Sequence, residues 1–344
     1  MTPSPFERLR SEMSAYMKVS VLAAFAELDF GTVILEHGNS LGAAELAEHC
    51  QCDGRGTETL LDVLAAIGYL RKSGTGAEAR YSVVEDYKAF LDSRHPSTFI
   101  PMMRHMANGQ RTWARLTWSV KDGRPQERIP SILGAEQDRI SFIMGMNSIA
   151  TRLAGEVMNS LRKVGILPFS NQNPRILDIG GASGTYTEAF LKEMPGASAT
   201  IFDLPVGIAQ AKKRFTDSPF GSRVTLVEGD FTKDPLPSGF DFAWISAIIH
   251  QMDRNESRML YAKALNALAP GGMAAVRDYV MSEDRLMPAD GALFGINMFV
   301  NTQNGMVYTY REIKEDLEAA GFAQVTHAVD VPSMAAVVTA KKPG

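Results

Sequence analysis

The hydrophobic period of this 344-residue sequence changes after Pro174, and this change constrains the fold more than any other feature. Beyond Pro174, short apolar runs of strand length alternate with segments of helical period, which we expect over residues 184–192 and 206–215. The expected strands read RILDI, SATIFD, RVTLVEGD, FDFAWIS and MAAVRDYV. Alternation of this kind predicts a parallel sheet with right-handed crossovers.

The end of the chain departs from simple alternation. A helix expected over residues 310–320 is followed by FAQVTHAVDV and SMAAVVTAK, two strands joined by a short turn at Pro332. We expect them to form an antiparallel hairpin that completes the sheet.

The first part of the chain, from Phe6 to about Leu91, has apolar residues at helical spacings of three and four. Short extended pieces are expected over 68–71 and 80–84, on either side of the glycine-rich turn SGTGAE. This order predicts a winged-helix domain.

Winged helices often bind DNA through one helix, here expected over residues 57–70. That segment carries Glu58 and Asp62 and no lysine or arginine before Arg71. The charge favours dimerisation over DNA binding.

Residues 96–165 continue with helical spacing and many methionines and aromatics, and the loop sequence PFSNQNP closes this stretch. We therefore expect a winged-helix domain over residues 1–95, a helical linker over 96–165 and a sheet domain over 166–344. A chain of this length is long enough for more than one domain.

Composition narrows the choice of partners. The net charge of -4 gives no general attraction to nucleic acid or to an anionic membrane, so a small molecule fits better. No signal-peptide pattern or long apolar run is present, which predicts a cytoplasmic protein. Cys50 and Cys52 are too close for an ordinary disulfide, and the six histidines have no metal-ligand spacing, so we expect no metal.

The sequence LDIGGASG places a glycine-rich turn between the first expected strand and a helix, where open parallel sheets bind ligands. Gly180, Gly181 and Gly184 let the backbone approach a ligand closely. Position 182 is alanine, so the turn does not fit the G-x-G-x-x-G pattern, and a dinucleotide is disfavoured.

Acidic residues follow the next two expected strands. Asp203 stands where a carboxylate accepts both hydrogen bonds of a ribose diol, a geometry that serves NAD and S-adenosylmethionine equally. Asp230 stands where it can accept from an adenine amino group beside Phe231.

The order and spacing of several motifs resemble the caffeate and acetylserotonin O-methyltransferase family over nearly the whole chain. These motifs are AAELAEHC and LLDVLAAIGYL in the first domain, then LDIGGASG, FDLP, EGDF, IIHQMD, LAPGG and YREIKEDLEAAGF. The resemblance implies an α/β fold: a seven-stranded Rossmann-like methyltransferase sheet with an antiparallel C-terminal hairpin, preceded by a mainly helical winged-helix dimerisation domain. It also implies a homodimer through that domain and S-adenosylmethionine as cofactor.

The resemblance also implies roles for single residues. Ser246 occupies a position where plant members commonly carry a cofactor-contacting lysine. The predicted cofactor-binding residues are Asp178, Gly180, Gly181, Gly184, Asp203, Leu204, Asp230, Phe231 and Ser246.

Transfer of a methyl group to a hydroxyl needs a base, because a neutral hydroxyl is a weak nucleophile. His250, directly after the fourth expected strand, matches the family's general base, and Asp278 matches the acid that steadies it. The family's frequent HDW reads His250, Gln251, Met252 here, and a second expected carboxylate aligns with Val307. A less polarised base suits an acidic hydroxyl such as a phenol.

Apolar and amide side chains suited to a flat aromatic compound make up the predicted substrate pocket. They are Met103, Met106, Trp113, Phe142, Met146, Asn147, Phe294, Asn297, Met298 and Asn301. The function expected is S-adenosylmethionine-dependent methylation of a small, hydroxylated, aromatic metabolite. The departures leave open carbon or nitrogen methylation, or a non-methylating step. A ligand-sensing winged-helix regulator is the alternative of another class.

Overall fold

The structure, a computed structural model, describes residues 3–167, 169 and 171–344. It divides into two compact units. The N-terminal unit consists of Met1–Arg111 and Arg128–Ser148, and the C-terminal unit consists of Thr112–Glu127 and Ile149–Gly344. The segment expected as a linker, residues 96–165, is thus shared between both units.

The N-terminal unit is mainly helical, with one small antiparallel hairpin. Its elements are α1 (Pro5–Glu27), α2 (Phe30–Glu36), α3 (Ala43–His49), α4 (Gly54–Ala66), β1 (Leu70–Ser73), β2 (Arg80–Val83), α5 (Lys88–Leu91), nearly all of α6 (Ile100–Trp113) and the start of α8 (Ala135–Lys163). Ser4 begins α1 by accepting a hydrogen bond from the backbone N–H of Glu7, whose side chain accepts in return from Ser4.

The helix expected over 57–70 is α4, and its bounds were predicted wrongly. Asp53 caps its N-terminus by accepting from the backbone N–H of Gly56 at 2.7 Å, so the helix starts at Gly54 and includes Arg55. It ends at Ala66 because Gly68 adopts a φ of 88°. The statement that this helix carries no basic residue is therefore also wrong.

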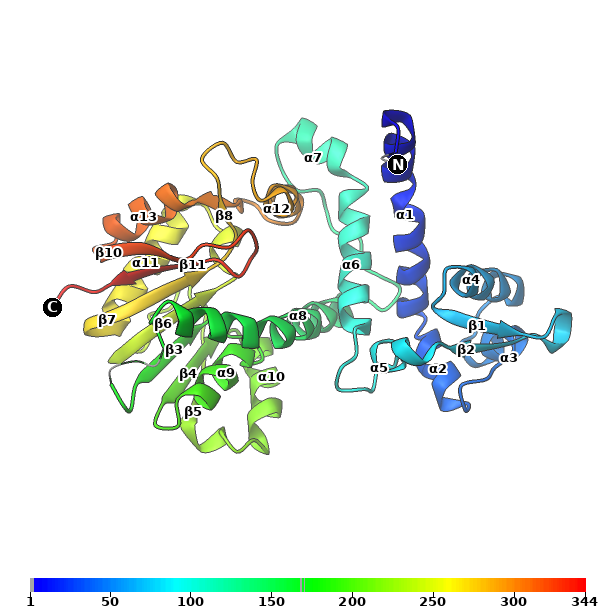
Figure 1. Cartoon of the computed structure of the whole chain (residues 1–344), viewed down its shortest axis with the longest axis horizontal. Helices are drawn as coiled ribbons and strands as arrows, with labels where there is room; N and C mark the ends of the chain where they lie inside the picture. The colour runs from blue at the N-terminus through cyan, green and yellow to red at the C-terminus, as the bar shows by residue number, and fades with distance from the viewer. Residues whose placement is uncertain (1–2, 168, 170) are drawn as a thin grey trace. The chain divides into compact units, whose positions relative to one another are not determined.

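The C-terminal unit contains a seven-stranded sheet in the order β10-β11-β7-β6-β3-β4-β5 (Figure 1). Five strands are parallel to one another: β3 (Arg175–Ile179), β4 (Ser198–Asp203), β5 (Val224–Glu228), β6 (Phe240–Ser246) and β7 (Leu268–Arg277). The last two, β10 (Ala323–Val329) and β11 (Val337–Lys341), pair antiparallel, as expected. The connection between them spans residues 330–336 and is longer than the short turn expected at Pro332.

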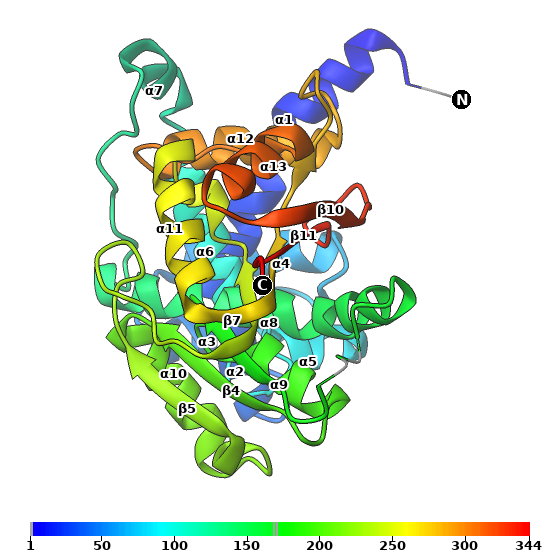
Figure 2. The same cartoon turned by 90° about the vertical axis from the view of Figure 1, so that its left-hand side faces the viewer.

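Helices cover both faces of this sheet, as Figures 1 and 2 show from two sides. One face packs against α11 (Arg254–Ala267) and α13 (Tyr310–Ala319). The other packs against the end of α8, α9 (Thr185–Glu193) and α10 (Pro205–Thr216). Trp244 is fully buried on this second face and meets Phe190 edge to face, with ring centroids 5.2 Å apart.

Further short elements follow the carboxyl ends of the strands or precede the sheet. They are α7 (Leu116–Asp122), α12 (Ala289–Asn301), and the parallel pair β8 (Val280–Met281) and β9 (Tyr308–Thr309). Short 3-10 turns occur at Gly76–Glu78, Glu85–Tyr87, Gly221–Arg223 and Ile249–Gln251. In the part of the chain that the structure describes, no helix is both long enough and apolar enough to cross a membrane.

Candidate functional site

The glycine-rich turn after β3 has little room for side chains. Gly180 and Gly184 have φ values of 67° and 78°, which glycine adopts most easily. A Cβ at Gly180 would lie 2.6 Å from the Ile248 side chain, and one at Gly184 would lie 2.4 Å from Phe215. The backbone of this turn is therefore held tightly against its neighbours at the carboxyl end of the sheet.

The side chain of Asp178 packs against the backbone of the glycine-rich turn. Its carboxylate is 2% exposed and accepts a hydrogen bond from the Thr187 hydroxyl at 2.6 Å. A Cβ at Gly181 would lie 2.6 Å from the Asp178 carboxyl carbon, so the two groups are in close contact. Burial raises the pKa of Asp178 to about 7. This predicted cofactor-binding residue lies beneath the loop.

Asp203 connects the end of β4 to the same turn. One carboxylate oxygen accepts from the backbone N–H of Ala182 at 2.7 Å and the other from that of Leu204 at 2.6 Å. Burial raises the pKa of Asp203, and these two N–H groups oppose the shift. Leu204, next in sequence, is 46% exposed.

Asp230 and Phe231 follow β5, the edge strand. Asp230 accepts from the backbone and hydroxyl of Thr232, at 2.9 and 2.5 Å, and these bonds hold its pKa below the usual value. The Phe231 ring lies 3.4 Å from the position of a Cβ at Gly180. The ends of β3 and β5 are thus brought together at one edge of the sheet.

His250 and Asp278 form a buried pair beside this edge. Asp278 follows β7 directly, and His250 lies in the 3-10 turn Ile249–Gln251 after β6. Nδ1 of the imidazole lies 2.9 and 2.8 Å from the two carboxylate oxygens, and the residues are 5% and 2% exposed. Asp278 also accepts from the backbone N–H of Tyr279 at 2.8 Å.

The pair fixes the roles of the imidazole nitrogens. Because Asp278 is an acceptor, Nδ1 of His250 carries the proton. Within the described residues, Nε2 of His250 has no hydrogen-bond partner. Such an imidazole can accept a proton at Nε2 while the carboxylate stabilises the resulting charge.

Three residues depart from the family pattern, namely Gln251, Met252 and Val307. Gln251 is exposed and donates to the backbone oxygen of Ala247 at 3.3 Å, whereas Met252 is buried in the core on the α11 face. Val307 is 7% exposed, and its backbone oxygen accepts from Arg285 at 2.7 Å. In the described part of the chain, Asp278 is the carboxylate that pairs with His250.

Five predicted substrate residues belong to the C-terminal unit, and hydrogen bonds connect three of them. The Phe294 ring meets His250 edge to face at 4.8 Å between centroids. Trp113 donates from its indole N–H to the Asn297 side chain at 2.9 Å, and Asn301 donates to the same oxygen at 3.1 Å. Met298 is buried on the same helix, α12.

The other five belong to the N-terminal unit: Met103, Met106, Phe142, Met146 and Asn147. Phe142 is 43% exposed, and its ring is tilted against that of His105 with 5.0 Å between the centroids. Met106 is 54% exposed. Met103 is buried in the core of this unit. That these five and the C-terminal residues line one pocket stays a prediction.

Sequence reasoning missed two side chains at this edge. Arg277, the last residue of β7, is 4% exposed and donates to the Ser246 hydroxyl at 2.7 Å. Tyr279 packs on Phe294, with ring centroids 5.3 Å apart. The sequence did contain a signal for Arg277, which is a basic residue inside the apolar run MAAVRDYV. Charged side chains are rarely buried without a partner, so this position could have been singled out.

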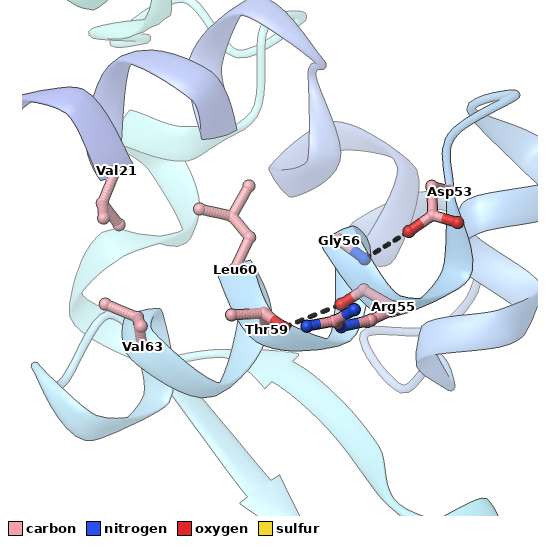
Figure 3. A pocket seen from close by; sticks show the side chains of 7 residues that line it. All are labelled: Val21, Asp53, Arg55, Gly56, Thr59, Leu60 and Val63. Atoms are coloured by element: carbon pink, nitrogen blue, oxygen red, sulfur yellow. Dashed lines mark hydrogen bonds between the residues drawn. The ribbon is translucent and has the colours of Figure 1, made fainter.

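A surface depression of about 450 Å³ lies in the N-terminal unit, between α1 and α4 (Figure 3). It is lined by Val21, Asp53, Arg55, Gly56, Thr59, Leu60 and Val63. None of these residues was predicted for the catalytic site. Among the described residues, no group of three or more histidine, cysteine or acidic side chains is arranged to hold a metal ion.

The edge of the sheet carries acidic, apolar and close-packed backbone groups of the kind that S-adenosylmethionine requires. The turn at Gly180–Gly184 leaves backbone where side chains would collide, and Asp203 and Asp230 present acceptors on neighbouring strand ends. Phe231 adds an apolar ring beside them. These residues therefore fit a nucleoside with an attached polar tail.

Comparison with known proteins agrees with this fit. The model of an O-methyltransferase domain matches residues 113–323, more than half of the chain, and that of an O-methyltransferase dimerisation domain matches residues 11–91. The chain is 29% identical to acetylserotonin O-methyltransferase of Gallus gallus over 323 residues, 91% of this chain and 90% of the relative. It is 30% identical to 3-hydroxy-5-methyl-1-naphthoate 3-O-methyltransferase of Streptomyces sahachiroi, over 82% of this chain and 80% of that one.

Solved structures confirm the fold. The structure of human N-acetylserotonin methyltransferase in complex with SAM superposes with a TM-score of 0.82 at 24% identity, covering 100% of this chain and 99% of the other. PigF with SAH gives a TM-score of 0.83 at 22% identity, over 99% and 100% of the two chains. The chain therefore belongs to the O-methyltransferase family and is an S-adenosylmethionine-dependent methyltransferase of small molecules.

Proposed function

We propose that this enzyme methylates a phenolic hydroxyl of a small aromatic molecule, with His250 as the general base. The observation that carries the proposal is the contact of Nδ1 of His250 with both carboxylate oxygens of Asp278, at 2.9 and 2.8 Å. This contact leaves Nε2 as the basic nitrogen, and both residues are buried at the carboxyl edge of the sheet. A base in this position acts on an acceptor that lies over the same edge.

In the proposed reaction, Nε2 of His250 takes the hydroxyl proton as the oxygen begins to attack. Asp278 stabilises the imidazolium and holds the ring in one orientation through Nδ1. S-adenosylmethionine supplies an electrophilic methyl group on a positively charged sulfur. We assign Asp203 to the ribose hydroxyls, Asp230 to the adenine amino group, and the turn at Gly180–Gly184 to the close backbone approach.

A phenol is favoured because His250 has a single carboxylate partner. Val307 stands where a second acid was expected, and it is buried and apolar. With less stabilisation of the imidazolium, the base is suited to a hydroxyl that is already acidic. The names of two relatives support this class, since acetylserotonin and 3-hydroxy-5-methyl-1-naphthoate are hydroxylated aromatic compounds.

The C-terminal unit also supports an aromatic acceptor. Phe294 packs against the imidazole, and Tyr279 packs against Phe294, so two aromatic rings lie beside His250. Asn297 and Asn301 add amide groups one and two helical turns further along α12. Amides of this kind orient a flat compound through its polar substituents.

The test is a panel of hydroxylated aromatics matched with their amino and hydrogen analogues. Purified enzyme is incubated with isotopically labelled S-adenosylmethionine, and products are identified by mass spectrometry. We expect methyl transfer to phenols only, with a preference for those of lower hydroxyl pKa. Transfer to carbon or nitrogen, or conversion without methyl transfer, would replace this proposal by one of the alternatives left open by the sequence.

We also propose that two copies of the chain associate through the N-terminal unit. Helix α1 carries exposed apolar side chains on consecutive turns, among them Phe6 (72%), Leu9 (62%) and Met13 (74%). A monomer that left this face in water would be unfavourable, and the dimerisation-domain model matches the same region. Light scattering at micromolar concentration should give twice the chain mass, and Leu9→Glu with Met13→Glu should give the monomer.

A further inference from the structure

Arg277 is a buried cation at the carboxyl end of β7. Its Nη1 donates to the Ser246 hydroxyl at 2.7 Å, and its guanidinium carbon lies 4.9 Å from the centre of the Tyr186 ring. Only 4% of the residue is exposed. Hydroxyl and aromatic contacts favour a guanidinium, but neither carries the negative charge that would neutralise it.

No carboxylate of the described chain is paired with this arginine. Asp178 and Asp203 lie on the same face of the sheet as Arg277. The Asp178 carboxylate accepts from Thr187 instead, and the Asp203 carboxylate accepts from the backbone N–H groups of Ala182 and Leu204. In the same described region, Nε of Arg277, the Tyr186 hydroxyl and the Trp244 indole N–H are buried without hydrogen-bond partners. A buried charge left without a counter-ion is strongly unfavourable, so an anionic group bound beside Arg277 would stabilise it.

The guanidinium lies beside the glycine-rich turn. Ile179 pairs with Ile245 in the sheet, so Gly180 and Ser246 are the next residues of neighbouring strands. Ser246 is in register with Arg277 on β7, and Tyr186 belongs to the first turn of α9, directly after the glycine-rich turn. Arg277 alternates with Asp278 along β7, which places it on the α9 face and the catalytic pair on the opposite face.

We propose that Arg277 binds the carboxylate of the amino-acid part of S-adenosylmethionine. The inference rests on the cofactor site proposed above. The cofactor has one anionic group, and a guanidinium forms two parallel hydrogen bonds with a carboxylate. Ser246, which stands where a cofactor-contacting lysine was expected, has no charge of its own, and its hydroxyl orients the arginine from the adjacent strand.

The test measures ligand binding without turnover. S-adenosylhomocysteine carries the carboxylate, whereas 5′-methylthioadenosine has the same nucleoside and thioether without the amino-acid part. By calorimetry, Arg277→Met should weaken S-adenosylhomocysteine by about 10 to 100-fold, the usual effect of losing charged hydrogen bonds. The affinity for 5′-methylthioadenosine should change by less than about threefold, because that ligand lacks the group that Arg277 binds.

Two further measurements guard against a variant that folds poorly. The wild-type enzyme itself should bind S-adenosylhomocysteine more tightly than its decarboxylated analogue, by the same factor that Arg277→Met loses. Arg175→Met serves as the matched control, because Arg175 lies at the amino end of β3, over the Phe240 ring. It should leave the affinities for both ligands unchanged.

Equal weakening of both ligands by Arg277→Met would overturn the proposal and give Arg277 a purely structural role. Unchanged binding of S-adenosylhomocysteine would overturn it as well. If the wild-type enzyme binds neither ligand, the cofactor site itself is wrong, which is a different failure from loss of the carboxylate contact.

Discussion

Nδ1 of His250 lies within hydrogen-bonding distance of both carboxylate oxygens of Asp278, although the two residues are 28 positions apart in the sequence. The histidine follows β6 and the aspartate follows β7, so the pairing of these parallel strands creates the contact. A carboxylate in this position orients the ring and favours its protonated form during proton transfer.

His250→Ala should lower turnover by about 100 to 10,000-fold, the usual range for a removed acid-base group. The dissociation constant of the cofactor should stay nearly unchanged, since the imidazole does not contact the strand ends assigned to it. The loss should shrink as assay pH approaches the pKa of the substrate hydroxyl, because an anionic substrate needs no base. His37→Ala, an exposed histidine of the N-terminal unit, is the control. Near-normal turnover of His250→Ala at neutral pH would show that the ring only packs or orients.

Asp278→Asn should cost less turnover than His250→Ala, because the imidazole remains and loses only its charged partner. The double variant should be no slower than His250→Ala alone, since the carboxylate acts through the histidine. Single-turnover rates of the wild type, the two single variants and the double variant measure the coupling between His250 and Asp278. Additive losses would mean that Asp278 has a role independent of His250.

Asp203→Ala should weaken S-adenosylhomocysteine by about 1.5 to 3 kcal/mol, the cost of losing hydrogen bonds to a charged group. Part of the loss arises because Asp203 also holds the backbone N–H of Ala182 in the glycine-rich turn. Asp217→Ala, a surface variant at the end of α10, should have no effect in the same calorimetric titration. Unchanged affinity of Asp203→Ala would remove Asp203 from the cofactor site.

The stability of the protein should depend on the protonation of Asp178. Its pKa in the folded state is raised by burial to about 7, above the ordinary value near 4. The folded state therefore binds this proton more tightly than the unfolded state does. The contribution of this proton to the free energy of unfolding is largest below about pH 4 and is lost as the pH rises to about 7. Three pKa units correspond to roughly 4 kcal/mol.

Urea unfolding at several pH values between 5 and 8 checks this dependence. Relative to wild type, Asp178→Asn should gain stability as pH rises, because the amide never ionises in the buried site. Asp217→Asn should follow the wild-type curve. Parallel curves for Asp178→Asn and wild type would contradict the raised pKa.

Gly184→Ala should destabilise the C-terminal unit by about 2 to 5 kcal/mol, from a φ of 78° and a Cβ placed 2.4 Å from Phe215. Gly155→Ala is the matched control, because Gly155 lies within α8 with nothing within 4 Å of the added carbon. It should gain about 0.5 to 1 kcal/mol from helix propensity. Chemical denaturation of both variants measures these free energies of unfolding. Equal changes in the two variants would contradict the crowding at Gly184.

Much of the fold was predictable because the signals are local. The strands RILDI, SATIFD and FDFAWIS were expected from their apolar runs, and the structure has them as β3, β4 and β6 in one seven-stranded sheet. The glycines of LDIGGASG likewise indicated a tight turn, which the φ values of Gly180 and Gly184 confirm. The start of α4 was missed because its signal was a single capping residue, Asp53, rather than the apolar period.

Tertiary structure alone decided which polar groups meet and which are buried. Asp178 and Asp203 look alike in sequence, one inside a strand and one at its end, yet one lies under the turn and the other holds the turn's backbone. The contact of Arg277 with Ser246 and Tyr186 joins three segments that no local pattern connects. Periodicity, turns and caps depend on residues a few positions apart, so the sequence by itself determines them. Burial, ion pairing and pKa depend on distant segments packed side by side, and only the folded chain determines those.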